Sequence, residues 1–323
     1  MENAATHCCS RREASHGVGA TAVGTPAGTI RRGDMVWIPG GRFQMGSNAF
    51  YREERPVRIA SVEGFWIDRF PVTNAEFGRF VTATGYVTFS ERVPSAEMYP
   101  DAASEFLVPG SLVFVKPTGP VSLRDHRAWW AYVPGADWRH PNGPGSSIAG
   151  KASHPVVHVT FEDACAYAAW AGKELPDEAE WEFAARGGLE GAAYPWGDAA
   201  NPGGRYMANT WQGRFPFENL AEDGYDGTSP VDAFPPNGYG LHDMVGNVWE
   251  WTASAYAPQN GADTSCCNRA APDPRSRLRV VKGGSHLCAP NYCLRYRPAA
   301  RQGETTDSST CHIGFRCIVR GPD

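Results

Sequence analysis

Apolar and polar residues alternate only over short runs in the first part of the chain, and glycine or proline ends each run. Met35–Ile38 is predicted to be a strand, residues 39–41 a turn, and residues 43–46 the hairpin partner of that strand. Strand-like segments continue over residues 57–67 and break near Gly64. The pattern indicates short strands joined by tight turns.

Three later runs also have the pattern of strands. They cover residues 154–159, 278–281 and 314–320. In the last run Phe315, Cys317 and Val319 share one face, which is typical of a half-buried strand. We therefore predict that Cys317 is a thiol of the core rather than a reactive group.

Short amphipathic helices are predicted where a capping box precedes apolar residues at helical spacing. The predicted N-caps are Thr73, Thr160 and Asp177, and the predicted stops are Gly85, Gly172 and Gly187. The helices do not alternate with strands along the chain, so a doubly wound sheet is not expected.

Long stretches without clear periodicity separate these elements, notably residues 86–148 and 201–251. The chain has 323 residues, of which 36 are glycine and 26 are proline, and this content favours turns and ordered loops. We predict one α+β domain over residues 34–321, with little regular secondary structure.

Residues 1–33 are rich in Ala, Gly, Thr, Ser and Arg and lack the apolar core of a secretory signal. We predict a disordered leader there and a cytoplasmic location. The nine cysteines would then meet a reducing environment, and their odd number prevents complete pairing within the chain. Cys266 and Cys267 have no role that the sequence indicates.

Charge and hydropathy argue against two classes of partner, nucleic acids and membranes. The formal net charge is −5, which does not suggest nucleic acid as the main partner. No apolar run reaches the roughly 18 residues that a membrane span needs, so no membrane insertion is expected.

One stretch, residues 282–297, carries the candidate chemistry. Cys288 and Cys293 are five residues apart, and Pro290 between them disfavours a helix. We predict a loop that folds back and brings the two sulfurs together. The pair could then be a local disulfide, two structural thiols, or a site for a soft metal such as copper(I).

Several motifs together resemble the formylglycine-generating enzymes, the sulfatase-modifying factor family. The motifs lie at residues 37–46, 71–74, 137–141, 175–182, 209–213, 245–251 and 314–317. They also occur in a wider superfamily that includes non-catalytic relatives and sulfoxide synthases. The resemblance to the oxidases rests on residues 283–285, followed by Cys288, Cys293 and the segments 295–297 and 299–301.

The resemblance implies a variant of the C-type-lectin fold and a specific reaction. The family oxidises the cysteine of a Cys-x-Pro-x-Arg motif in client proteins, usually sulfatases, to Cα-formylglycine with dioxygen. The alternative is a non-catalytic, peptide-binding lectin-like module, although known relatives of that kind lack the cysteine pair. A sulfoxide synthase would need an additional histidine-rich domain for iron.

The resemblance also implies roles for single residues. Cys288 and Cys293 would hold copper(I), and Ser285, Trp249 and Arg301 would complete the catalytic site. Tyr292 would pack on the client's proline. Outside the resemblance, Ser285 could stabilise a turn, Trp249 could belong to the core and Arg301 to a structural ion pair.

Two sets of oxygen donors resemble structural calcium sites of the family. The first set is Asn209, Thr210, Asp223 and Tyr225, and the second is Asp243, Gly246, Val248 and Glu250. Without the resemblance, both would be interpreted as ordinary loop carboxylates.

Departures from the family also carry information. Animal members form disulfides at positions equivalent to Ala168, Ala185 and Pro298, and the absence of cysteine there is typical of a cytosolic prokaryotic enzyme. Residues 90–112 differ from better-known members in the region expected to bind the client's arginine. Glu91 and Glu97 are the sequence-based candidates for that contact.

Overall fold

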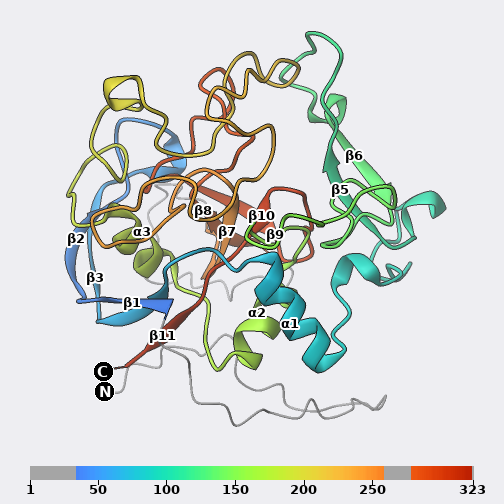
Figure 1. Ribbon diagram of the computed structural model, residues 1–323, viewed down its shortest axis with the longest axis horizontal. Helices are drawn as coiled ribbons and strands as arrows, with labels where there is room; N and C mark the ends of the chain where they lie inside the picture. The colour runs from blue at the N-terminus through green and yellow to red at the C-terminus, as the bar shows by residue number, and fades with distance from the viewer. Residues whose placement is uncertain (1–33, 258–277, 322–323) are drawn as a thin grey trace, which may run out of the picture.

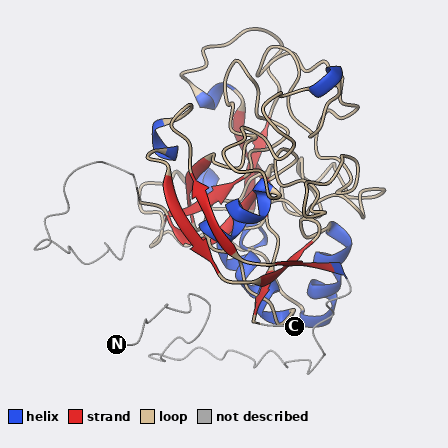
Figure 2. Ribbon diagram, turned by 90° about the vertical axis from the view of Figure 1, so that its left-hand side faces the viewer, coloured by secondary structure: helices blue, strands red, loops and turns tan. Residues whose placement is uncertain are grey.

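The computed structural model describes residues 34–257 and 278–321. The predicted leader over residues 1–33 and the pair Cys266 and Cys267 lie outside the described residues. Figure 1 shows short strands near the centre of the molecule and long connecting segments around them. Figure 2 shows that loops occupy much of one half of the molecule, while most strands and helices lie in the other.

The strands form two larger sheets and two separate ribbons. One sheet has the order β1-β4-β11, and the other has the order β10-β7-β8-β9; β2 pairs with β3, and β5 pairs with β6. The strands are β1 (Met35–Ile38), β2 (Gly41–Met45), β3 (Arg58–Val62), β4 (Phe65–Asp68), β5 (Gly110–Phe114), β6 (Trp130–Pro134), β7 (Trp249–Ala255), β8 (Leu278–Lys282), β9 (Arg301–Thr305), β10 (Ile313–Gly314) and β11 (Ile318–Arg320).

The predicted helices are confirmed, together with their capping boxes. They are α1 (Asn74–Thr84), α2 (Phe161–Trp170) and α3 (Glu178–Arg186). Short 3-10 turns lie at Arg52–Glu54, Phe89–Glu91, Ser104–Phe106, His126–Ala128 and Pro202–Gly204. In the described part of the chain, no helix combines the length and the apolar character that a membrane crossing requires.

The predicted pairing of β1 with β2 is wrong. Ile38 of β1 faces Phe65 of β4, and Gly41 of β2 faces Val62 of β3, so the register continues across both pairs. β1 and β2 are therefore one bent arm of a longer hairpin, and β3 and β4 are the other arm. Gly40, at φ 41°, lies where the bend is tightest, because a Cβ there would be 2.7 Å from the carbonyl oxygen of Val62.

Two predicted strands are also corrected. Residues 154–159 form only an isolated bridge at Pro155, because proline has no N–H and His158 adopts a positive φ of 59°. The run over residues 314–320 is not one half-buried strand, since its ends belong to different sheets. Cys317 in the middle is fully buried, as predicted.

Residues 86–148 contain an element that the sequence did not indicate, the antiparallel ribbon of β5 and β6. Its long connection lacks a tight hairpin turn, which is the strongest local signal for such a pair. The ribbon carries Trp130 and Leu112 toward the cavity described below. In Figure 1 it lies on the right of the molecule, away from the bent hairpin.

Buried histidines make the fold sensitive to acid. His158 is fully buried, and burial lowers its pKa to about 4. In the unfolded chain its pKa is about 6.5, so below that pH the unfolded state takes up a proton that the folded state does not. The contribution of His158 to stability is therefore complete above pH 6.5 and falls as the pH approaches 4.

We expect this residue to account for a loss of about 2 kcal/mol in the free energy of unfolding between pH 7 and pH 5. Urea denaturation of the wild type and of His158→Gln at both pH values measures the effect. The variant should lose about 2 kcal/mol less than the wild type over this interval. Equal losses in both proteins would contradict the assignment.

Candidate active site

The candidate catalytic loop begins where β8 ends at two glycines. Gly283 and Gly284 have φ values of 91° and 71°, and a Cβ on Gly284 would lie 2.8 Å from the backbone nitrogen of Tyr296. Only glycine fits this close approach without strain. The turn brings the backbone of Gly284 against that of Arg295 and Tyr296, so the two ends of the loop lie side by side.

Backbone hydrogen bonds then fold the loop back on itself, as predicted. The N–H of Cys288 donates to the carbonyl of Ser285 at 2.9 Å, and the N–H of Cys293 donates to that of Ala289 at 2.8 Å. The two Sγ atoms of Cys288 and Cys293 are 3.0 Å apart. A disulfide bond is about 2.05 Å long, so the sulfurs are adjacent but not bonded to each other.

The surroundings of the two sulfurs differ. The N–H of Ser285 donates to the sulfur of Cys288 at 3.5 Å, while Nη1 of Arg295 lies 3.8 Å from the sulfur of Cys293. The hydrogen bond from Cys288 is the main cause that lowers the pKa of Cys293 to about 7, against the effect of burial and with help from Arg295. Burial raises the pKa of Cys288 well above its ordinary value. Cys293 is therefore the member of the pair that more readily becomes a thiolate.

Both sulfurs lie in the wall of a cavity of about 630 Å³. Five of the sequence-predicted residues line it together: Trp249, Ser285, Cys288, Tyr292 and Cys293. Trp129, Trp130 and Phe215 add aromatic surface, and Gln302, Glu304, Thr310 and His312 add polar groups. His126, Arg127 and Arg295 also line it, so the cavity combines an aromatic wall with many polar and charged groups, which suits a ligand that has both apolar and polar parts.

The other three sequence-predicted residues of the cavity wall are Ser285, Trp249 and Tyr292. Ser285 is fully buried, and its hydroxyl accepts a hydrogen bond from the N–H of Leu287 at 3.2 Å. Trp249 is only 3% exposed and is the first residue of β7. Tyr292 is 40% exposed, and its ring stacks on Phe215 with centroids 4.6 Å apart. Tyr292 is therefore a supported aromatic surface that a ligand in the cavity can reach.

Arg301 does not line this cavity. Side chains alternate along β9, so Gln302 and Glu304 face the cavity while Arg301 faces away from it. Its guanidinium donates to both carboxylate oxygens of Glu178, at 2.7 and 3.1 Å. The structure thus places Arg301 in a buried ion pair, and a role in the reaction stays a prediction.

The site also includes residues to which the sequence analysis assigned no role. Arg295 reaches from the sulfur of Cys293 to Glu53, whose Oε1 accepts from Nη2 at 2.6 Å. Its guanidinium carbon lies 3.9 Å from the ring centroid of Tyr51. Glu53 and Tyr51 come from a distant part of the chain, so sequence spacing could not have linked them to the loop. The position of Arg295 two residues after Cys293 was the available signal.

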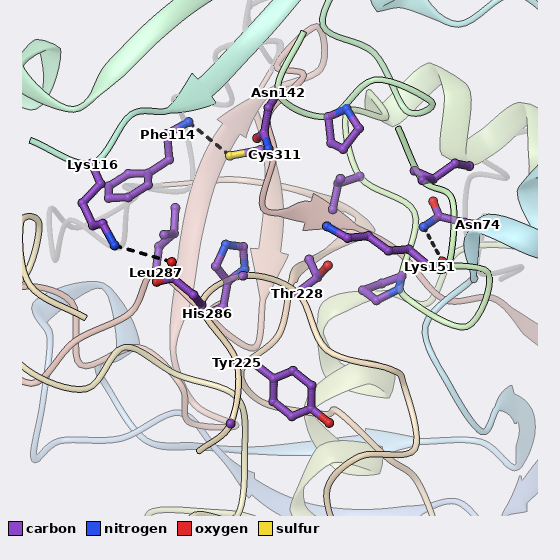
Figure 3. Close-up of a pocket in the computed structure, with 17 residues that line it drawn as sticks. Asn74, Phe114, Lys116, Asn142, Lys151, Tyr225, Thr228, His286, Leu287 and Cys311 are labelled. Atoms are coloured by element: carbon purple, nitrogen blue, oxygen red, sulfur yellow. Dashed lines mark hydrogen bonds and ion pairs between the residues drawn. The ribbon is translucent and has the colours of Figure 1, made fainter. Parts of the chain in front are cut away.

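His286 is a hydrogen-bonded structural histidine, which is the most common role of a single histidine. Its Nδ1 donates to the carbonyl of Asn247 at 2.8 Å, and burial lowers its pKa to about 4. Figure 3 shows His286 and Leu287 on one side of a second cavity of about 510 Å³, with Lys151 and Asn74 on another side. The catalytic loop therefore separates two cavities.

The first predicted calcium set is brought together around Asp223. Its Oδ2 accepts from the N–H of Thr210 at 3.1 Å, and its Oδ1 accepts from the N–H of Tyr225 at 3.0 Å. The side-chain amide of Gln212 donates to the carbonyl of Thr210 and to the carboxylate of Asp223. Asn209 is 1% exposed, and its buried Oδ1 has no hydrogen-bond partner among the described residues.

The second predicted calcium set lies in the segment that leads into β7. Oδ1 of Asp243 is buried without a partner among the described residues, and burial raises the pKa of this carboxyl to about 7. The carboxylate of Glu250 instead accepts three hydrogen bonds, from Trp181 and Arg316. Over residues 34–257 and 278–321, no three His, Cys, Asp or Glu side chains are grouped as metal ligands. Each set would therefore combine carboxylates with amide or backbone oxygens.

The family model of the sulfatase-modifying factor enzyme 1-like domain matches residues 21–321. The chain therefore belongs to this family, in agreement with the resemblance seen in its motifs. The formylglycine-generating enzyme of Mycobacterium tuberculosis is 54% identical over 293 residues, which cover 88% of this chain and 97% of that protein.

Two further relatives bear on fold and function. The inactive C-alpha-formylglycine-generating enzyme 2 of Bos taurus is 44% identical over 289 residues, which cover 88% of this chain and 87% of that protein. The solved structure of PvdO from Pseudomonas aeruginosa has a TM-score of 0.56 at 26% identity and covers 88% of this chain and 93% of that one. The predicted α+β, C-type-lectin-like fold of the sulfatase-modifying factors is confirmed. Relatives named as enzymes and as inactive proteins are both similar to this chain, so the residues of its site decide whether it is catalytic.

Proposed function

We propose that this protein is an oxidase that converts the cysteine of a Cys-x-Pro-x-Arg motif in client proteins, such as sulfatases, to Cα-formylglycine with dioxygen. The observation that carries the proposal is the pair of unbonded sulfurs, 3.0 Å apart, in the wall of an aromatic cavity. A module that only binds peptides has no need for two adjacent thiols. Relatives named formylglycine-generating enzyme support the same reaction.

The donor set in the cavity fits copper(I). Two thiolate donors suit a soft ion, whereas structural zinc and iron–sulfur sites usually take four ligands. Cys288 and Cys293 would hold the ion, and Arg295 beside Cys293 would favour its thiolate form. Bound copper would supply the one-electron chemistry that dioxygen needs to react with an organic thiol.

The other lining residues orient the client and control water. Tyr292 offers its exposed ring to an apolar group such as the client's proline. Trp249 forms a flat wall beside the sulfurs, and Ser285 provides a hydroxyl fixed by its bond to Leu287. In the overall reaction the client's CH2–SH group loses two electrons and two protons to dioxygen, which would leave as hydrogen peroxide, or as two waters if an external thiol supplies two further electrons and protons. Water then supplies the aldehyde oxygen, and the sulfur leaves as hydrogen sulfide.

Incubation of the purified protein with a Cys-x-Pro-x-Arg peptide, copper and air tests this function. Mass spectrometry should show the loss of one sulfur and two hydrogens and the gain of one oxygen. A copper chelator should stop the conversion. An unmodified peptide that nevertheless binds the protein would support the non-catalytic module instead.

We also propose that calcium stabilises the loops through the two oxygen-rich sets. The buried oxygens of Asn209 and Asp243 that have no partner in the described part of the chain are suitable donors, because calcium prefers carboxylate, amide and carbonyl oxygens. Thr210, Asp223 and Tyr225 would complete the first site. The second site would use Asp243, Gly246, Val248 and Glu250, whose carboxylate also accepts hydrogen bonds from Arg316.

Calcium at about 100 times its Kd should therefore add about 2.7 kcal/mol to the free energy of unfolding and raise Tm by several degrees. Differential scanning fluorimetry with calcium and with a chelator measures this shift. Asn209→Ala should reduce the shift, whereas Asn142→Ala, outside both sets, should retain it. A wild-type Tm that does not respond to calcium would refute the proposal.

A further inference from the structure

The turn between β2 and β3 contacts the part of the catalytic loop that directly follows Cys293. The hydroxyl of Tyr51, in this turn, accepts a hydrogen bond from the N–H of Leu294 at 2.9 Å. That N–H belongs to the peptide bond between Cys293 and Leu294, so Tyr51 holds the backbone next to the cysteine. Tyr51 does not line the catalytic cavity. It therefore supports the wall that carries the sulfur and leaves the cavity itself open to a client.

The same turn also holds Leu294 through a buried arginine. Nε of Arg297 donates to the carbonyl of Leu294 at 2.9 Å. The guanidinium of Arg297 donates to both carboxylate oxygens of Glu54, and its carbon lies 3.6 Å from the ring centroid of Phe50. Arg297 and Glu54 are almost completely buried. The backbone of Leu294 is thus fixed at its N–H by Tyr51 and at its carbonyl by Arg297.

The turn is in turn anchored to α3, so it can act as a rigid support. The N–H of Gly46 donates to Oε1 of Glu182 at 2.8 Å, and the carbonyl of Gly46 accepts from Nη2 of Arg186 at 3.1 Å. The N–H of Ser47 donates to the carbonyl of Glu54 at 3.1 Å and closes the turn. The position of Cys293 therefore depends on residues that lie far from it in the sequence.

The other cysteine is held by a different part of the chain. The carbonyl of Cys288 accepts from the N–H of Trp211 at 3.0 Å, and the N–H of His286 donates to the carbonyl of Asn247 at 2.9 Å. The sulfurs of Cys288 and Cys293 are 3.0 Å apart and not bonded to each other. Their separation is therefore set by two independent supports, one on each side of the loop.

We propose that Tyr51 is a positioning residue, which holds the sulfur of Cys293 beside that of Cys288. The inference rests on the proposed function, in which the two sulfurs act as one unit. A functional group keeps its place when the atoms next to it are fixed by packing and hydrogen bonds. Loss of the Tyr51 hydroxyl leaves the N–H of Leu294 without this partner, while the ring can keep its contact with Arg295. The backbone after Cys293 should then move more freely.

Tyr51→Phe tests this role, because it removes only the hydroxyl. The matched control is Tyr132→Phe. The hydroxyl of Tyr132 donates to the carbonyl of Val108 at 2.6 Å, and Tyr132 lies on β6 and does not line the catalytic cavity. Each variant therefore loses one hydrogen bond between a tyrosine and the backbone. Urea denaturation shows that both variants are folded and how much stability each has lost.

The readout is the equilibrium between the two thiols and a disulfide in metal-free protein. The protein is held without air in mixtures of reduced and oxidised dithiothreitol. When the S–S bond forms, the two thiols lose two electrons and two protons, which reduce the disulfide of oxidised dithiothreitol. After alkylation, trypsin cleaves behind Lys282 and Arg295 and releases residues 283–295, which contain both cysteines. The mass of this peptide gives the fraction of closed pairs.

Tyr51→Phe should lower the equilibrium constant for closing the pair by about tenfold, which raises its reduction potential by about 30 mV. The reason is that a freer backbone brings the two sulfurs together less often. Tyr132→Phe should stay within about twofold of the wild type. If Tyr51→Phe has the wild-type constant, or if Tyr132→Phe changes it as much, Tyr51 does not position the sulfur.

Steady-state kinetics with a Cys-x-Pro-x-Arg peptide extends the test to the reaction. Tyr51→Phe should lower kcat by about tenfold and leave KM unchanged, since Tyr51 does not line the cavity that a client fills. A change in KM alone would contradict a positioning role. Wild-type protein that converts no peptide would refute the oxidase function, whereas the dithiothreitol equilibrium would still decide whether Tyr51 positions Cys293.

Discussion

Replacing either Cys288 or Cys293 with serine should reduce kcat/KM for formylglycine formation by about a thousandfold or more, because the two sulfurs act as one unit. They are 3.0 Å apart in the same cavity wall, so loss of one leaves a single soft donor. The double variant should therefore be little worse than either single variant. Steady-state kinetics with a Cys-x-Pro-x-Arg peptide measures all three variants.

Cys311→Ser is the matched control for these variants. Cys311 is a half-buried cysteine whose thiol accepts a hydrogen bond from the N–H of Phe114 at 3.3 Å, but it lines the second cavity rather than the catalytic one. Its replacement should leave the rate within a few-fold of the wild type. If Cys293→Ser retained a rate like that of Cys311→Ser, the paired-sulfur account of catalysis would be wrong.

The second large effect is expected on stability, at the buried ion pair of Arg316 and Glu250. Both side chains are fully buried, and Nε and Nη2 of Arg316 each donate to the Glu250 carboxylate at 2.8 Å. Arg316→Met removes the cation and leaves a buried, uncompensated charge. We expect a loss of about 3–5 kcal/mol in the free energy of unfolding, measured by urea denaturation.

The control for this prediction is Arg320→Met. Arg320 pairs with Glu174 and Glu180, but its side chain is 40% exposed, so its loss should cost only about 1 kcal/mol or less. The double variant Arg316→Met with Glu250→Gln should be more stable than Arg316→Met alone, because it removes the unpaired charge. Equal losses for Arg316→Met and Arg320→Met would show that the buried pair is not a centre of stability.

The helices could be predicted because their signals are local. At Thr73, Thr160 and Asp177 a side chain bonds the backbone three residues ahead, and this interaction depends only on neighbouring residues. The pairing of β1 with β4 is set by a bend at Gly40, which packs against residues from the other arm of the hairpin. Nothing near β1 in the sequence indicates that partner.

The contrast between local signals and contacts of distant residues also explains which parts of the site could be predicted. The fold-back of the cysteine loop depends on two glycines and a proline within the loop, so the closeness of Cys288 and Cys293 was accessible from spacing. The side of β9 that faces the cavity depends on its register with β8, which the sequence does not contain. Arg301 was therefore expected in the cavity, while Glu304, three residues later, was missed.

The most direct test of the central claim is an anaerobic copper(I) titration of the wild type, Cys288→Ser and Cys311→Ser, with a competing chelator to report affinity. The account predicts tight binding of one copper ion by the wild type and by Cys311→Ser, and loss of that binding in Cys288→Ser. Unchanged copper(I) affinity in Cys288→Ser would contradict the claim that the sulfurs at positions 288 and 293 hold the metal.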